Sequence, residues 1–132
     1  MTMKKQITGL LEVSGRTGSG KTCLALMVTE SVLREGKKVL YADPEATVRN
    51  FAPMEDPNFI LIEEDSVHGL LHAIHSNLSD PNLNLGLIVL DNLSVLTSAV
   101  GIEGVVTLLS EELSDLGLRV PVIVTKQTRE RE

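Results

Sequence analysis

Residues 14–23 read SGRTGSGKTC, a glycine-rich segment that ends in a lysine, a threonine and a cysteine. An apolar run at residues 10–13 precedes it and predicts a strand, whereas residues 21–35 are rich in helix formers. Gly36 follows as a natural helix cap, because glycine readily takes the left-handed conformation in which many helices end. The segment is therefore predicted to be a turn between a buried strand and a helix.

The same alternation continues along the chain. Residues 66–78 and 102–116 carry apolar side chains at helical spacing and predict two further helices. Strands that are apolar throughout and alternate with helices are typical of a parallel sheet covered on both faces. The sequence therefore predicts an α/β fold in a single domain, residues 1–132, whose strands lie at residues 10–13, 38–42, 59–63, 87–91 and 120–125.

Composition indicates the environment and the kinds of partner that suit this protein. The apolar runs are too short to cross a bilayer, and the one cysteine cannot form an internal disulfide, so we expect a soluble cytoplasmic protein with no membrane partner. No secretory signal is visible in residues 1–6. A net charge of -6, from 18 acidic against 12 basic residues, disfavours a large nucleic-acid surface.

The opening segment matches the pattern GxxxxGK[ST] between a strand and a helix, which is the context of a phosphate-binding P-loop. Glycines allow successive N–H groups to point inward and surround phosphate oxygens at the positive end of the helix. Lys21 is predicted to reach the β and γ phosphates of ATP, and the Thr22 hydroxyl to bind Mg²⁺. The predicted nucleotide-binding residues are Gly15, Arg16, Thr17, Gly18, Ser19, Gly20, Lys21 and Thr22.

A second metal ligand is predicted in the segment LGLIVLDNLSVL, residues 85–96. Its apolar run ends in Asp91, where a buried strand emerges, and it resembles a Walker B segment. In such a segment the carboxylate holds Mg²⁺ beside the nucleotide. An aspartate at a strand end can also simply cap the next turn, but the upstream P-loop favours the metal role.

Two further segments complete a pattern that resembles a known family. GKKVLYADPEA, residues 36–46, follows the P-loop helix, and VPVIVTKQT, residues 120–128, runs from a strand into a polar pair. This order is similar to the core of the RecA family, which includes RadA-type recombinases, DnaB-like helicases and KaiC-like ATPases. The resemblance implies a three-layer P-loop NTPase with a mostly parallel five-stranded sheet in the order 3-2-4-5-1. It also implies Mg²⁺-dependent ATP hydrolysis.

The resemblance assigns roles to two more residues. Glu45 matches the glutamate that activates water, and Gln127 matches the glutamine that senses the γ phosphate. Glu45 leaves the carboxyl end of a strand, where ligands bind in open α/β sheets, and Asp43 is its rival for that role. A glutamine amide can donate to a phosphate oxygen while its carbonyl engages a neighbour. Lys21, Glu45 and Gln127 are thus the predicted catalytic residues.

Family members commonly form rings or filaments in which a neighbour supplies cations to the phosphates. Lys126, Arg129 and Arg131 are the candidates here, although a solvated charged tail is an equal alternative. Slow hydrolysis by the isolated chain is therefore expected. The resemblance implies a role in DNA recombination, repair, replication or a related oligomeric process. DNA binding itself stays open, because the chain does not continue into the family's DNA-binding loop and contains only 2% aromatic residues.

Other readings of the same residues remain open. The chain could be a nucleotide-binding subunit that does not hydrolyse ATP, or a small-molecule kinase, although no insertion suits a kinase lid. The family strand order would place the P-loop strand at a sheet edge. A GTPase is disfavoured because the stretches expected to carry DxxG and NKxD read DNLS and TKQT.

Smaller features are predicted to be structural. His68, His72 and His75 have a spacing that can bind a metal, but we expect them to be surface side chains. Cys23 is expected to be a small buried packing residue. None of the aromatic residues, Tyr41, Phe51 and Phe59, can be assigned to a nucleotide base from the sequence.

Overall fold

Strands and helices alternate along the chain, as the sequence predicts, except that residues 43–58, between the second and third strands, form a loop without a helix. The computed structural model describes residues 7–15, 20–80, 83–92, 101–116 and 119–127. The elements begin and end within a few residues of their predicted bounds. They are β1 (Ile7–Gly15), α1 (Lys21–Arg34), β2 (Lys38–Ala42), β3 (Phe59–Ile62), α2 (Val67–Leu78), β4 (Leu85–Leu90), α3 (Gly101–Leu116) and β5 (Val120–Gln127).

Hydrogen bonds join the strands into one sheet in the order β1-β5-β4-β2-β3. Every pair is parallel, which confirms the α/β class and the parallel sheet. The order is the one that the family resemblance implies, counted from the opposite edge, and it leaves β1 at an edge of the sheet. Because all strands point the same way, their carboxyl ends meet at one edge of the molecule.

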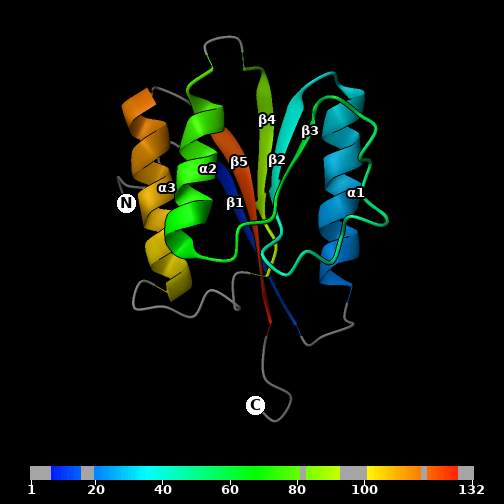
Figure 1. The fold of residues 1–132 in the computed structure, drawn as a ribbon, viewed down its shortest axis with the longest axis horizontal. Coiled ribbons are helices and arrows are strands. Elements are labelled where there is room, and N and C mark those ends of the chain that lie inside the picture. Colours follow the sequence, from blue (N-terminus) through cyan, green and yellow to red (C-terminus); the bar gives the residue numbers. More distant parts are fainter. Residues whose placement is uncertain (1–6, 16–19, 81–82, 93–100, 117–118, 128–132) are drawn as a thin grey trace.

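The helices cover both faces of the sheet, as Figure 1 shows, with α1 on one side and α2 and α3 on the other. One apolar core packs the sheet against α2 and α3, through residues such as Leu70, Ile74 and Leu109. The other packs the sheet against α1, through residues such as Ala25 and Leu33. Strands β2 and β4 contribute side chains to both cores, which explains why neither strand alternates apolar with polar residues.

Local signals account for the helix ends. Gly20 precedes α1 with a φ of 91°, and Gly36 follows it with a φ of 83°. Residues other than glycine rarely adopt this left-handed backbone conformation. The hydroxyl of Ser66 caps α2 by accepting a hydrogen bond of 3.0 Å from the Gly69 N–H. None of the described helices is long and apolar enough to cross a membrane.

The expectation for Cys23 was wrong. Its side chain is exposed rather than buried. The buried residues of α1 are Ala25, Thr29 and Leu33, at helical spacing, so the face of the helix that meets the sheet does not include Cys23.

Candidate functional site

Asp91 lies at the centre of a buried cluster of hydroxyl groups. It directly follows β4, and its side chain is only 3% exposed. Its carboxylate accepts hydrogen bonds from Thr22 Oγ1 at 3.1 Å, Tyr41 Oη at 2.5 Å and Thr125 Oγ1 at 2.6 Å. These bonds satisfy a carboxylate whose burial would otherwise be strongly unfavourable.

The parallel sheet brings these side chains together. Tyr41 and Thr125 lie on the strands that flank β4, namely β2 and β5, and Thr22 lies in the first turn of α1. Thr22 and Asp91, the two predicted metal ligands, are thereby in direct contact although 69 positions separate them in the chain. The structure thus joins the predicted P-loop helix to the predicted Walker B aspartate.

Thr125 has a fixed orientation because it accepts one hydrogen bond and donates another. The backbone N–H of Asn92 donates to Thr125 Oγ1 at 2.5 Å, and Thr125 Oγ1 donates to Asp91 Oδ1 at 2.6 Å. Asn92 has a φ of 65°, in the left-handed region that asparagine tolerates better than most residues. Asn92, just beyond the end of β4, is thereby held against β5.

Among the residues that the structure describes, Tyr41 is the largest fully buried side chain. Burial raises the pKa of its phenol, and the charge of Asp91 and the hydrogen bond to it raise the pKa further. The phenol therefore keeps its proton and acts as a donor to the carboxylate. Sequence reasoning missed both Tyr41 and Thr125. The available signal was a polar side chain inside a strand that is otherwise apolar, because a buried hydroxyl usually needs a partner.

Asp43 holds the turn that follows β2. It is 2% exposed, and its Oδ2 accepts hydrogen bonds from the backbone N–H groups of Thr47 at 2.7 Å and Val48 at 2.9 Å. Burial raises the pKa of Asp43; the two backbone hydrogen bonds oppose this rise, and the charge of Asp91 adds to it. A carboxylate used in this way shapes the loop, which favours Glu45 over Asp43 as the group that meets solvent.

Glu45 is exposed at the carboxyl edge of the sheet. Its Oε1 accepts a hydrogen bond of 2.9 Å from Asn92 Nδ2. Asn92 adjoins Asp91, so this bond ties Glu45 to the Asp91 cluster across 47 positions of sequence. Asn92 is a third residue, after Tyr41 and Thr125, that the sequence did not single out.

A hollow of about 380 Å³ adjoins the start of α1. It is lined by Gly20, Lys21, Thr22, Cys23, Leu26 and Phe51. The Phe51 side chain is 62% exposed and comes from the loop after β2. The structure thus places an aromatic ring beside the predicted phosphate loop. The sequence did not indicate this position for Phe51.

The remaining predicted residues are described only in part. The backbone of Gly15 pairs with that of Gln127, and Ser14 pairs with Lys126, at the carboxyl ends of β1 and β5. The side chains of Lys126 and Gln127 are outside what the structure describes. So are six whole residues among the predictions: Arg16, Thr17, Gly18, Ser19, Arg129 and Arg131.

His68, His72 and His75 are exposed on α2, as expected. His75 Nδ1 pairs with the Glu112 carboxylate on α3. Among the described residues, no group of three or more His, Cys, Asp or Glu side chains could hold a metal ion. The pair formed by Thr22 and Asp91 offers hydroxyl and carboxylate oxygens instead, the donor type that Mg²⁺ prefers when phosphates and waters supply its other ligands.

No protein-family model matches the chain, and no curated protein is significantly similar to it in sequence. The resemblance to the RecA family therefore stays a prediction from the residues of this chain.

Proposed function

We propose that this chain is a Mg²⁺-dependent ATP-binding P-loop ATPase of RecA type. The observation that carries the proposal is the 3.1 Å hydrogen bond from Thr22 Oγ1 to Asp91 Oδ2. A threonine that follows GK at a helix start and an aspartate that follows a buried strand are the two groups that hold Mg²⁺ in P-loop enzymes. If the match to the P-loop motif were a coincidence, nothing would require Thr22 and Asp91 to lie in contact.

Phosphate binding is assigned to the start of α1. Backbone N–H groups at a helix N-terminus have no partner within the helix and carry partial positive charge, so they favour phosphate oxygens. Lys21, the first residue of α1, adds a full positive charge and lines the adjoining hollow. Thr22 and Asp91 would hold Mg²⁺, which supplies charge neutralisation on the phosphates when bound.

Water activation is assigned to Glu45. Its carboxylate is exposed at the edge where the strands end, while the Asn92 amide restrains it. A positioned carboxylate can accept a proton from water as that water attacks the γ phosphate. Gln127 is proposed as the γ-phosphate sensor, and Lys126, Arg129 and Arg131 as cations offered to a neighbouring copy.

The base of the nucleotide is assigned to the Phe51 ring. The hollow of about 380 Å³ lies within the range typical of small-molecule sites, and it runs from the phosphate-binding residues to an exposed aromatic face. Any base can stack on such a ring.

Equilibrium binding of a fluorescent ATP analogue, with and without Mg²⁺, tests the site directly. Lys21→Ala should weaken binding by roughly tenfold or more because it removes a charge that contacts phosphate. Lys37→Ala is the matched control, since Lys37 is exposed at the other end of α1 and contacts Glu35. Equal affinity in the two variants, or no binding by the native chain, would contradict the proposal.

ATP turnover over a series of protein concentrations tests the catalytic assignment. Specific activity should rise with concentration if a neighbour completes the site, and Glu45→Gln should abolish it while leaving ATP binding intact. Glu55→Gln, in an exposed loop residue, is the control. Binding without turnover at any concentration would favour the non-hydrolysing subunit, and phosphate transfer to a small molecule would favour the kinase. Stimulation by single-stranded DNA would extend the proposal to a recombinase-like role.

A further inference from the structure

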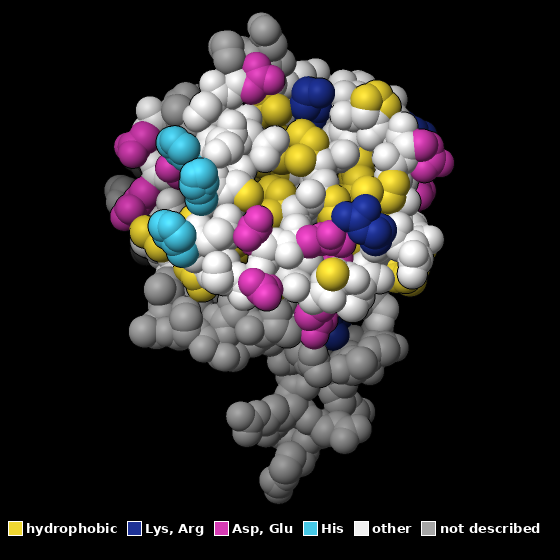
Figure 2. All heavy atoms as spheres, viewed as in Figure 1, with side chains coloured by type: hydrophobic (Ala, Val, Ile, Leu, Met, Phe, Trp, Pro, Cys, Tyr) yellow, Lys and Arg dark blue, Asp and Glu magenta, His cyan; other side chains and the backbone are white. Residues whose placement is uncertain are grey.

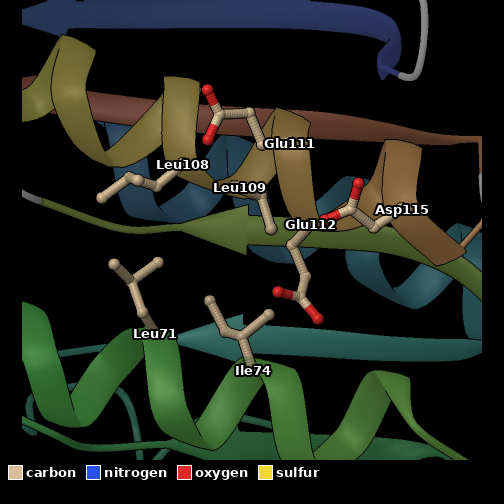
Figure 3. Close-up of a pocket in the computed structure, with 7 residues that line it drawn as sticks. All are labelled: Leu71, Ile74, Leu108, Leu109, Glu111, Glu112 and Asp115. Carbon is tan, nitrogen blue, oxygen red and sulfur yellow. The ribbon is translucent and has the colours of Figure 1, made fainter.

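A groove lies between α2 and α3, on the face of the sheet opposite α1. Its volume is about 220 Å³. Figure 3 shows Leu71 and Ile74 of α2 opposite Leu108 and Leu109 of α3 across the groove. Ile74 and Leu109 belong to the buried core, so the floor of the groove is continuous with the interior of the protein.

The apolar lining extends to the surface. Leu108 is 41% exposed, although most large apolar side chains of the two helices are buried or half-buried. A single exposed leucine needs no explanation, but here it borders a cavity with an apolar floor. Such a surface suits the apolar side of an amphipathic segment.

The rim of the groove is acidic. Glu111, Glu112 and Asp115 line it together with the leucines, and Figure 3 shows the Glu112 carboxylate pointing between the two helices, toward Ile74. Neither helix contains a lysine or an arginine in its sequence, so the helices themselves supply no permanent positive charge to this face. Figure 2 shows the three histidines in a row beside acidic side chains, and one of them, His75, pairs with Glu112.

We propose that the groove between α2 and α3 binds a basic amphipathic helix of a partner protein. Apolar side chains of that helix occupy the groove, and its lysines or arginines lie against Glu111, Glu112 and Asp115. The acidic rim repels phosphates, which excludes nucleic acid as the occupant. It selects a basic partner by charge complementarity, while the apolar contact supplies burial. This interaction is independent of ATP binding at the Asp91 cluster.

Fluorescence anisotropy with the full chain and a labelled synthetic peptide tests the proposal. The probe is a peptide of about four helical turns, with leucines on one face and lysines elsewhere. One control peptide has the same composition in scrambled order, which removes the apolar face. The other replaces each lysine with glutamate. Only the first peptide should bind, and its affinity should fall as salt is raised.

Substitutions of residues that line the groove test whether the peptide binds there. Leu108→Gln should weaken binding by roughly tenfold, and the double change Glu111→Gln and Asp115→Asn should weaken it and reduce its salt dependence. Met27→Gln and Glu30→Gln are matched controls, because both residues are exposed on α1, on the other face of the sheet. Circular dichroism verifies that each variant is folded.

Several results would overturn the proposal. These are equal binding of the scrambled peptide, unchanged affinity in the groove variants, or no binding of the basic peptide. Self-association of the chain that disappears in Leu108→Gln would assign the groove to a second copy instead. Analytical ultracentrifugation of the native chain and Leu108→Gln measures this outcome.

Discussion

The phenol of Tyr41 donates a hydrogen bond of 2.5 Å to Asp91 Oδ2, across the boundary between β2 and β4. Both residues lie at or just beyond the carboxyl ends of their strands, and both are almost fully buried. The phenol holds one carboxylate oxygen, and Thr125 holds the other. Asp91 is thus positioned by the sheet before any ligand arrives.

Tyr41→Phe removes the phenol hydroxyl and keeps the ring. We expect the free energy of unfolding to fall by about 1–2 kcal/mol, because a buried carboxylate loses one of its donors. Chemical denaturation measures the change. Phe59→Leu is a useful comparison, since it alters the neighbouring ring, which packs against Tyr41, without touching Asp91. A Tyr41→Phe protein as stable as the native chain would show that the bond contributes nothing.

Thr22→Ala should raise the Mg²⁺ concentration needed for half-maximal ATP binding by about tenfold or more, because the hydroxyl is a proposed ligand. Thr22→Ser keeps a hydroxyl and should restore most of the native response. Nucleotide binding in the presence of a chelator should be similar in all three proteins. An identical Mg²⁺ dependence in the alanine and serine variants would remove Thr22 from the metal site.

Phe51→Ala should weaken ATP binding by about tenfold, since loss of a stacking contact removes roughly 1–3 kcal/mol. Inorganic triphosphate, which has no base, should bind the variant and the native chain equally well. Isothermal titration with both ligands gives the comparison. Weaker triphosphate binding would mean that the change disturbs the phosphate loop and that the ring does not hold the base.

Asp43→Asn should change how stability depends on pH. The pKa of Asp43 is raised above its ordinary value of 3.8, so the folded state holds this proton more tightly than the unfolded state does. The free energy of unfolding of the native chain therefore decreases as pH rises from 3.8 through the raised pKa, because the folded state must then ionise a buried carboxyl group. Asparagine can still accept from Thr47 and Val48, and it does not ionise.

The variant should accordingly gain stability relative to the native chain as pH rises from 3.8 through the raised pKa of Asp43. Denaturation midpoints at several pH values measure the difference. Asp56→Asn, in a half-buried loop residue, is a control. A stability difference that is constant with pH would show that Asp43 titrates alike in the folded and unfolded chains.

Local sequence determined the elements of this protein. Apolar runs marked the strands, and Gly36 marked the end of the first helix, because periodicity and capping act within a few residues. The alternation of those elements was enough to predict a parallel sheet. The motif at residues 15–22 and the aspartate after β4 were likewise visible, since each is a short pattern attached to one element.

Only the tertiary structure decided which side chains meet. Contacts of Asp91 with Tyr41 and Thr125 depend on the lateral order and register of β2, β4 and β5, which are set by long-range packing. The exposure of Cys23 depended on which side of α1 faces the sheet, and the placement of Phe51 on the path of a loop. The groove between α2 and α3 likewise needed two helices that lie apart in sequence to pack side by side. Sequence patterns thus specified the elements and their chemistry, whereas packing between elements specified the site.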